Sequence, residues 1–326
     1  MAYLLPLFQS LLTKPKLQSH AFSPQVLILT LNRQLESQIL SSISRLSVGT
    51  NLVSLIYPIP MGLPLLNFKN PCFILSTPRS LRHAHKSPRS LDRFLSNTQS
   101  VIFDEADAIL QTPEGERLLQ EISRINRKLH PIQTLFCGAS LPRVFSTKKS
   151  RKPGALIDRW MPDLEWQVCD PESMNPLDRI KEEFIEFSPD TFEQGSMQVL
   201  EILIEEDLKK GGKWLLFCNS LEYLERMHQR LASLKRSSVR VFCVHGHQTQ
   251  PERGSTLEEF GRLRKEGLDL CLTTGLLARG IDVPGVTRVI NLQEARHPIE
   301  HGHRIGRCGR AGANGHALTF KTLAVE

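Results

Sequence analysis

Several features are scarce or absent in this chain, and each absence excludes a class of protein. No Gly-x-x-x-x-Gly-Lys-Ser/Thr motif occurs, so the loop that cradles nucleotide phosphates in many ATP-binding proteins is not found in these residues. The 7 cysteines form no Cys-x-x-Cys pair and are odd in number, which argues against a disulfide framework and a zinc site. No apolar run reaches the ~18 residues of a membrane span, and the sparse, scattered aromatic residues do not predict a base-stacking platform.

Positive charge is present in excess, and it is distributed unevenly. The 326 residues, enough for about two domains, carry a formal net charge of +7. Residues 1–172 contain 20 Lys and Arg against 13 Asp and Glu, whereas residues 173–326 contain 21 of each. This surplus suits an anionic partner such as RNA, although a solvated basic surface explains the charge equally well.

Short apolar runs alternate with longer amphipathic ones along the whole chain. This alternation predicts an α/β protein with two domains built on parallel sheets. Charge and proline around residues 150–180 indicate a connection, so the predicted domains are 1–172 and 173–326. The predicted strands are Val26–Thr30, Cys72–Ser76, Val101–Phe103, Thr134–Cys137, Trp214–Cys218, Val239–Val244, Asp269–Thr273, Val286–Asn291 and Ala317–Phe320. The predicted helices are 4–12, Arg33–Arg45, Glu116–Lys128, Glu193–Lys209, Leu221–Leu234 and Pro251–Glu266, and Gly211-Gly212-Lys213 is predicted to form a turn.

Two groups of side chains have the chemistry of a phosphoryl-transfer site. Asp104 and Glu105 directly follow an apolar strand, where a carboxylate pair can hold Mg²⁺ and orient a water molecule. Arg307 and Arg310 lie three residues apart in a glycine-rich segment, and their guanidinium groups fit phosphate oxygens. An RNA-phosphate patch or a solvated turn would explain the two arginines equally well.

An ordered set of motifs decides between the phosphoryl-transfer site and the other two interpretations. The motifs are Val26–Thr30 with Arg33 and Gln38, Ser76-Thr77-Pro78, Asp104-Glu105-Ala106-Asp107, Cys137–Pro142, Leu216–Ser220, His245-Gly246, Thr274 with Ala278–Asp282, and His303–Arg310. Together they resemble the motifs of the DEAD-box ATP-dependent RNA helicases, in family order and over essentially the whole chain, with a faint likeness to the mitochondrial branch.

This resemblance implies two RecA-like domains, the first expected to be truncated at its N-terminus because it begins after the family's phosphate loop. It also implies a protein that binds RNA, ATP and Mg²⁺ and separates short duplexes locally. The implied catalytic residues are Asp104 for Mg²⁺, Glu105 for the attacking water, and Arg307 and Arg310 for the phosphates. The implied positions for other roles are Gly280 and Asp282 for the nucleotide, Asp107, Ser140 and His303 for coupling, and Arg33, Thr77, Gly246 and Thr274 for the RNA backbone.

Departures from the family pattern leave a second hypothesis open. Leu31-Asn32 replaces Pro-Thr, Arg79-Ser80 replaces Gly-Arg, Gly138 replaces Ser, Gly275 replaces Asp and Cys308 replaces Thr. With the phosphate loop absent from these residues, the alternative is a non-catalytic RNA-binding or assembly protein. We expect a monomer without a membrane partner, which could bind ribosome-assembly or other ribonucleoprotein factors. Cysteines within apolar runs indicate a reducing intracellular compartment, with mitochondrion, nucleus or nucleolus, and cytoplasm all open.

Overall fold

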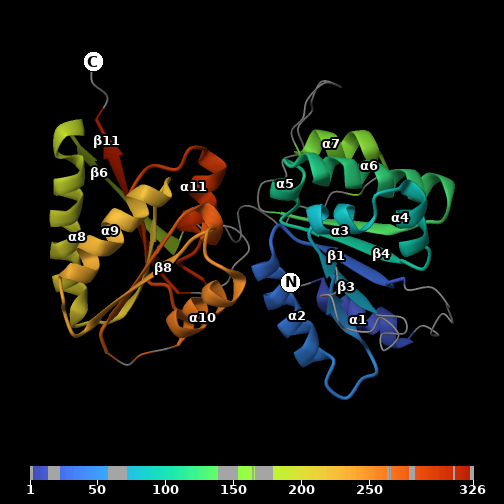
Figure 1. Cartoon of the computed structure of the whole chain (residues 1–326), viewed down its shortest axis with the longest axis horizontal. Helices are drawn as coiled ribbons and strands as arrows, with labels where there is room; N and C mark the ends of the chain where they lie inside the picture. Colours follow the sequence, from blue (N-terminus) through green and yellow to red (C-terminus); the bar gives the residue numbers. More distant parts are fainter. Residues whose placement is uncertain are drawn as a thin grey trace. The chain divides into compact units, whose positions relative to one another are not determined.

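The chain forms two compact units, Met1–Trp166 and Gln167–Glu326 (Figure 1). The computed structural model describes residues 3–13, 23–57, 72–138, 153–163, 165, 179–262, 264, 266–278, 283–310 and 313–323. The domain boundary predicted between residues 172 and 173 lies outside the described residues and stays a prediction.

The first unit is built on a five-stranded parallel sheet with the order β2-β3-β1-β4-β5. Its strands are β1 Val26–Leu29, β2 Ser54–Ile56, β3 Phe73–Ser76, β4 Ser100–Asp104 and β5 Gln133–Cys137. Its helices are α1 Leu4–Thr13, α2 Arg33–Leu46, α3 Pro78–Ala84, α4 Pro88–Phe94, α5 Ala106–Ile109, α6 Pro113–Lys128 and α7 Pro153–Trp160.

Both faces of this sheet are covered, because alternate residues of each strand point to opposite sides. Val26 and Ile28 of β1 belong to an apolar cluster with α1 and α2 on one face. Leu27 and Leu29 belong to a second cluster with α3 to α7 on the other face. The unit therefore has three layers, and its central strand β1 is a continuous, fully buried apolar run.

The second unit repeats this plan on a six-stranded parallel sheet with the order β6-β11-β10-β7-β9-β8. Its strands are β6 Ile180–Phe187, β7 Gly212–Phe217, β8 Val239–Val244, β9 Leu268–Thr273, β10 Arg288–Asn291 and β11 Gly315–Thr322. Its helices are α8 Phe192–Leu208, α9 Leu221–Ser233, α10 Gln250–Gly261 and α11 Pro298–Ile305, with 3-10 turns at Pro189–Thr191 and Gly275–Ala278.

Two clusters again fill the spaces above and below this sheet. Trp214 and Leu216 of β7 pack with α8 and α9, whereas Leu215 and Phe217 pack with residues of α10 and α11. The α/β fold class with parallel sheets, predicted from the alternation of apolar runs, is thus confirmed for both units.

Some local predictions need correction. Gly212 and Lys213 are not in a turn but begin β7, where the Lys213 ammonium is buried and donates to the Gly261 carbonyl at 2.7 Å. Helix α10 ends at Gly261 rather than at residue 266, because Arg262 already has extended backbone angles. Free thiols are found at all six cysteines that the structure describes. Within the described residues, no helix has the length and apolarity needed to cross a membrane.

Candidate functional site

Three predicted site residues of the first unit lie at one edge of its sheet. Arg33 follows β1, Thr77 follows β3 and Asp104 ends β4. Leu29 of β1 stands opposite Ser76 of β3 and Phe103 of β4, so the carboxyl ends of the three parallel strands are level. Ligands of open parallel sheets bind beyond this edge, and the sheet therefore brings RNA-contact and metal-binding candidates together within one unit.

The Asp104 carboxylate has a partner that the sequence did not reveal. The Tyr3 hydroxyl, just before α1, donates a hydrogen bond of 2.9 Å to Asp104 Oδ2. Burial raises the pKa of Asp104, and the bond from Tyr3 opposes that shift. A half-buried carboxylate at the end of a strand suits a hydrated divalent cation, which would compensate its charge.

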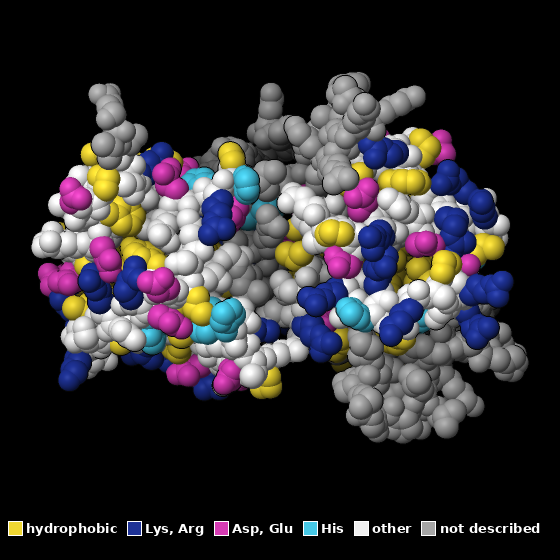
Figure 2. All heavy atoms as spheres, turned by 45° about the horizontal axis from the view of Figure 1, so that its top comes forward, with side chains coloured by type: hydrophobic (Ala, Val, Ile, Leu, Met, Phe, Trp, Pro, Cys, Tyr) yellow, Lys and Arg dark blue, Asp and Glu magenta, His cyan; other side chains and the backbone are white. Residues whose placement is uncertain are grey.

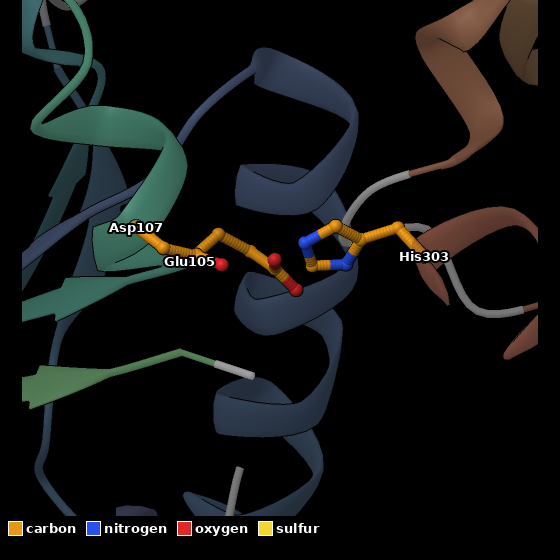
Figure 3. A group of neighbouring side chains, drawn as sticks. All are labelled: Glu105, Asp107 and His303. Carbon is orange, nitrogen blue, oxygen red and sulfur yellow. The ribbon is translucent and has the colours of Figure 1, made fainter. Parts of the chain in front are cut away.

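Glu105 occupies a conformation that a residue with a Cβ rarely adopts. Its φ of 59° and ψ of 47° are left-handed, and it caps the N-terminus of α5 without a hydrogen bond from its side chain. A left-handed residue other than glycine costs on the order of 1–2 kcal/mol, and such strain concentrates at functional sites. The sharp turn directs the chain from β4 into α5, which carries Asp107. Figure 3 shows the side chains of Glu105 and Asp107 on this segment.

A buried acid lies beside the two RNA-contact candidates of this unit. Glu36, on α2, is 1% exposed, and neither carboxylate oxygen has a hydrogen-bond partner among the described residues at normal bonding geometry. Burial raises the pKa of Glu36 to about 7, while the nearby Arg33 charge and the Thr77 backbone act in the opposite direction. Sequence reasoning missed this residue because nothing in its local pattern distinguishes it from an exposed helix glutamate.

The second unit brings its own two RNA-contact candidates together. Gly246 follows β8 and Thr274 follows β9. These strands are paired in parallel with Val244 opposite Thr273, so both candidates lie at the carboxyl edge of the sheet. Gly246 is exposed, and a Cβ added there would meet no atom within 4 Å.

Helix α11 and the turn after it carry His303, Arg307 and Arg310. Figure 3 shows the His303 side chain projecting from α11. The Arg307 side chain donates from Nε to the His303 carbonyl at 3.1 Å, and Arg310 donates from Nε to the Gly306 carbonyl at 3.0 Å. These bonds tie both guanidinium groups to the end of the helix, which limits the entropy lost when they bind an anion.

Arg304, in the same motif, is a structural residue that sequence reasoning missed. Its side chain is 1% exposed and donates to Asn219 Oδ1 at 2.7 Å, to Glu300 Oε1 at 2.6 Å and to the Gln293 carbonyl at 3.1 Å. Asn219 follows β7 and Gln293 follows β10, so one buried guanidinium joins α11 to the ends of two strands. Arg304 therefore fixes the helix that presents His303.

The remaining predicted positions are Ser140, Gly280 and Asp282, and they lie outside the described residues. The two units thus differ in the charged groups that their candidate catalytic positions provide. The first unit offers carboxylates beyond β4, and the second offers guanidinium groups after α11.

Comparison with known proteins agrees with this division. The family model DEAD/DEAH box helicase matches residues 1–147, and the model Helicase conserved C-terminal domain matches residues 196–312. ATP-dependent RNA helicase RhlB of Escherichia coli is 30% identical over 325 residues, covering 98% of this chain and 71% of RhlB. ATP-dependent RNA helicase Dbp8 of Aspergillus niger is 28% identical over 307 residues, covering 90% of this chain but only 55% of Dbp8.

Solved structures show the same fold. S. cerevisiae Dbp5, solved with RNA and ADP BeF3, has a TM-score of 0.73 at 22% identity and covers 100% of this chain and 76% of that one. DEAD-box helicase Mss116, solved with single-stranded RNA and UDP-BeF, has a TM-score of 0.76 at 21% identity, covering 98% of this chain and 64% of that one. The prediction of two RecA-like domains is confirmed by these neighbours.

Proposed function

Because this chain belongs to the DEAD-box family of RNA helicases, we propose that it binds RNA and couples ATP hydrolysis to local separation of short RNA duplexes. The observation that carries the proposal is the placement of Asp104 and Glu105 at the carboxyl edge of one parallel sheet. The strained turn at Glu105 supports it, because a solely structural turn would favour glycine there.

The proposed roles follow the chemistry of each side chain. Asp104 holds hydrated Mg²⁺, with Tyr3 orienting its carboxylate, and Glu105 accepts a hydrogen bond from the water that attacks the terminal phosphate. Arg307 and Arg310 supply positive charge to the phosphoryl group. Gly280 and Asp282 contact the nucleotide, while Asp107, Ser140 and His303 couple nucleotide state to RNA binding. When bound, Mg²⁺ neutralises charge that develops on the phosphates.

We propose that RNA is held through its backbone by Arg33, Thr77, Gly246 and Thr274. The exposed Arg33 guanidinium can pair with a phosphate, and the exposed, unobstructed backbone at Gly246 allows a strand to approach closely. Such contacts are insensitive to base identity, so binding should be sequence-tolerant and weaken as salt increases.

A second candidate function is RNA binding or assembly without hydrolysis. It is favoured by the departures from the family's motifs within the chain, such as Gly138 in place of Ser and Gly275 in place of Asp. Ribonucleoprotein factors as partners, a monomeric state and a reducing compartment belong to the proposal in either case.

The test is RNA-stimulated phosphate release. We expect none above background from a polypeptide of residues 1–326, because no group in it replaces the lysine and backbone N–H groups of the phosphate loop. A chimera with the phosphate-loop segment of RhlB placed before Met1 should hydrolyse ATP, and Glu105→Gln should reduce its rate at least about a hundredfold. A folded chimera that binds RNA and releases no phosphate would establish the second function instead.

A further inference from the structure

Helices α3 and α4 form a surface with an unusual charge balance. Residues 77–99 contain five basic side chains and a single acid, Asp92. Four of the bases are exposed and the fifth is half-buried. We call this set the α3–α4 basic surface, and it consists of Arg79, Arg82, Lys86, Arg89 and Arg93. Figure 2 shows Lys and Arg side chains gathered on the first unit, where acidic side chains are few.

The one acid in this segment does not neutralise the surface. Asp92 accepts a short hydrogen bond from the Arg124 guanidinium on α6, and Arg124 also contacts Glu121 at 2.9 Å. No ion pair joins any of the five bases to another residue within the part of the chain that the structure describes. Their charges are therefore available to an anionic ligand.

Packing beneath the surface holds it in one shape. His85 lies between the helices, its Nδ1 is 2.8 Å from Ser90 Oγ, and its ring packs on Tyr57 and Phe94 at centroid distances of 5.6 and 4.5 Å. Leu81 is completely buried, and Leu91 is 6% exposed. A rigid array of cations loses little backbone entropy when a ligand binds, which favours repeated contacts with a regular polyanion.

The surface lacks what a protein interface needs. Large hydrophobic side chains are exposed at Leu46, Val48, Val53 and Leu129, but none is exposed within residues 77–99. Protein interfaces have an apolar core, whereas nucleic-acid backbones are held mainly by Lys, Arg and polar groups. Helix α3, which carries Arg79 and Arg82 of this surface, is capped by Thr77, and Thr77 is itself a proposed RNA contact.

We propose that the α3–α4 basic surface binds the phosphate backbone of RNA beyond the contacts at Arg33 and Thr77, as an extension of the proposed RNA site that lengthens the bound strand. This inference rests on the proposed RNA-binding function. It concerns Lys86, Arg89 and Arg93, which lie in none of the motifs that identify the family. Their role is electrostatic and independent of base sequence.

The test compares two variants of the full chain that lose equal charge. Lys86→Gln, Arg89→Gln and Arg93→Gln together remove three charges from the surface. The control combines Arg45→Gln, Lys209→Gln and Lys235→Gln, which are exposed elsewhere and form no ion pair with a described residue. Binding of fluorescent single-stranded RNA of two sequences is titrated between low and physiological salt. Equal thermal unfolding of both variants establishes that each is folded.

We expect the surface variant to bind both sequences at least about tenfold more weakly at low salt, with a slope of log affinity against log salt reduced by about 2. The control should stay within about twofold of the parent chain. Arg33→Ala is measured beside them. If Arg33→Ala weakens binding and the surface variant matches the control, the inference is wrong and the proposed function stands. If no chain binds RNA, both fail. Binding of poly-glutamate is titrated in the same way. If the surface variant loses binding to poly-glutamate but keeps binding to RNA, the ligand is an acidic protein and the inference is overturned.

Discussion

At the scale of single residues, Glu36 combines burial with an ionisable group. An ionised carboxylate without hydrogen bonds is costly inside a protein, so the group remains protonated well above the pH at which an exposed glutamate ionises. Its pKa is about 7 in the folded chain against an ordinary value of 4.5. The folded state therefore binds this proton more tightly than the unfolded state does.

This difference predicts a loss of stability with increasing pH. The contribution of neutral Glu36 is fully present below pH 4.5, declines as pH rises through about 7, and changes little above that. We expect Glu36→Gln, which stays neutral, to exceed the parent chain in free energy of unfolding at pH 8.5 by on the order of 3 kcal/mol, and to match it near pH 4.5. Urea unfolding at both pH values measures this. Glu225→Gln, at an exposed position on α9, should follow the parent chain at both.

At the scale of secondary-structure elements, the close approach of α5 and α6 depends on one glycine. Thr112 caps α6 and accepts a hydrogen bond from the Gly115 backbone N–H at 3.1 Å. A Cβ on Gly115 would lie 2.1 Å from the Ile109 carbonyl oxygen at the end of α5. Because this neighbour is backbone, it cannot rotate away, and α6 would have to move from the segment that carries Glu105 and Asp107.

We therefore expect Gly115→Ala to destabilise the chain by about 1–3 kcal/mol or more, although alanine normally favours a helix. Gly254→Ala is the matched control, because Gly254 also lies inside a helix, α10, and a Cβ there meets nothing within 4 Å. That substitution should stabilise by about 0.5–1 kcal/mol. Thermal or urea unfolding of both variants decides the matter, and equal effects at the two glycines would contradict the close-packing argument.

Strands made mainly of apolar residues are the elements that the sequence predicts well. Strands β1, β4 and β9 are buried over nearly their whole length and consist mainly of apolar residues, which is typical of central parallel strands. Strand β6 was missed because it is a half-exposed edge strand whose charged side chains alternate with apolar ones. The short helices α3 and α4 were missed because each has one turn of apolar residues at most, too few for a helical period to be visible.

The candidate site likewise has a part that the sequence predicts and a part that it does not. The end of a strand can be located from the local sequence, so the residues expected at the carboxyl ends of strands could be anticipated. These residues are Arg33, Thr77, Asp104, Gly246 and Thr274. The bond between Tyr3 and Asp104 joins residues 101 positions apart, and the Arg304 network joins three separate segments. Contacts of this kind depend on packing between elements, for which a single sequence carries no periodic signal.

At the scale of the whole molecule, the apolar cores belong to separate units. The two clusters of the first unit draw all their buried residues from Leu4 to Met161, and those of the second draw theirs from Ile180 to Phe320. Strand β5 lies at one edge of the first sheet and pairs with β4 alone among the described strands. Leu135, Phe136 and Cys137 on this edge strand are only half-buried, although they are apolar. A partly exposed apolar edge is a site for association with other chains.

We expect a fragment of residues 177–326 to fold alone, because it keeps both of its apolar clusters and every strand of its sheet. It should remain monomeric and show a single cooperative thermal transition in circular dichroism. A fragment of residues 1–172 should be less stable and should aggregate through β5 at lower temperature, since apolar edge surface favours intermolecular pairing. Adding a charge to that edge by Phe136→Lys should reduce aggregation of the first fragment without increasing its melting temperature. A molten or aggregated 177–326 fragment beside a stable, monomeric 1–172 fragment would show that the second unit depends on the first, and that separate cores do not make it an independent domain.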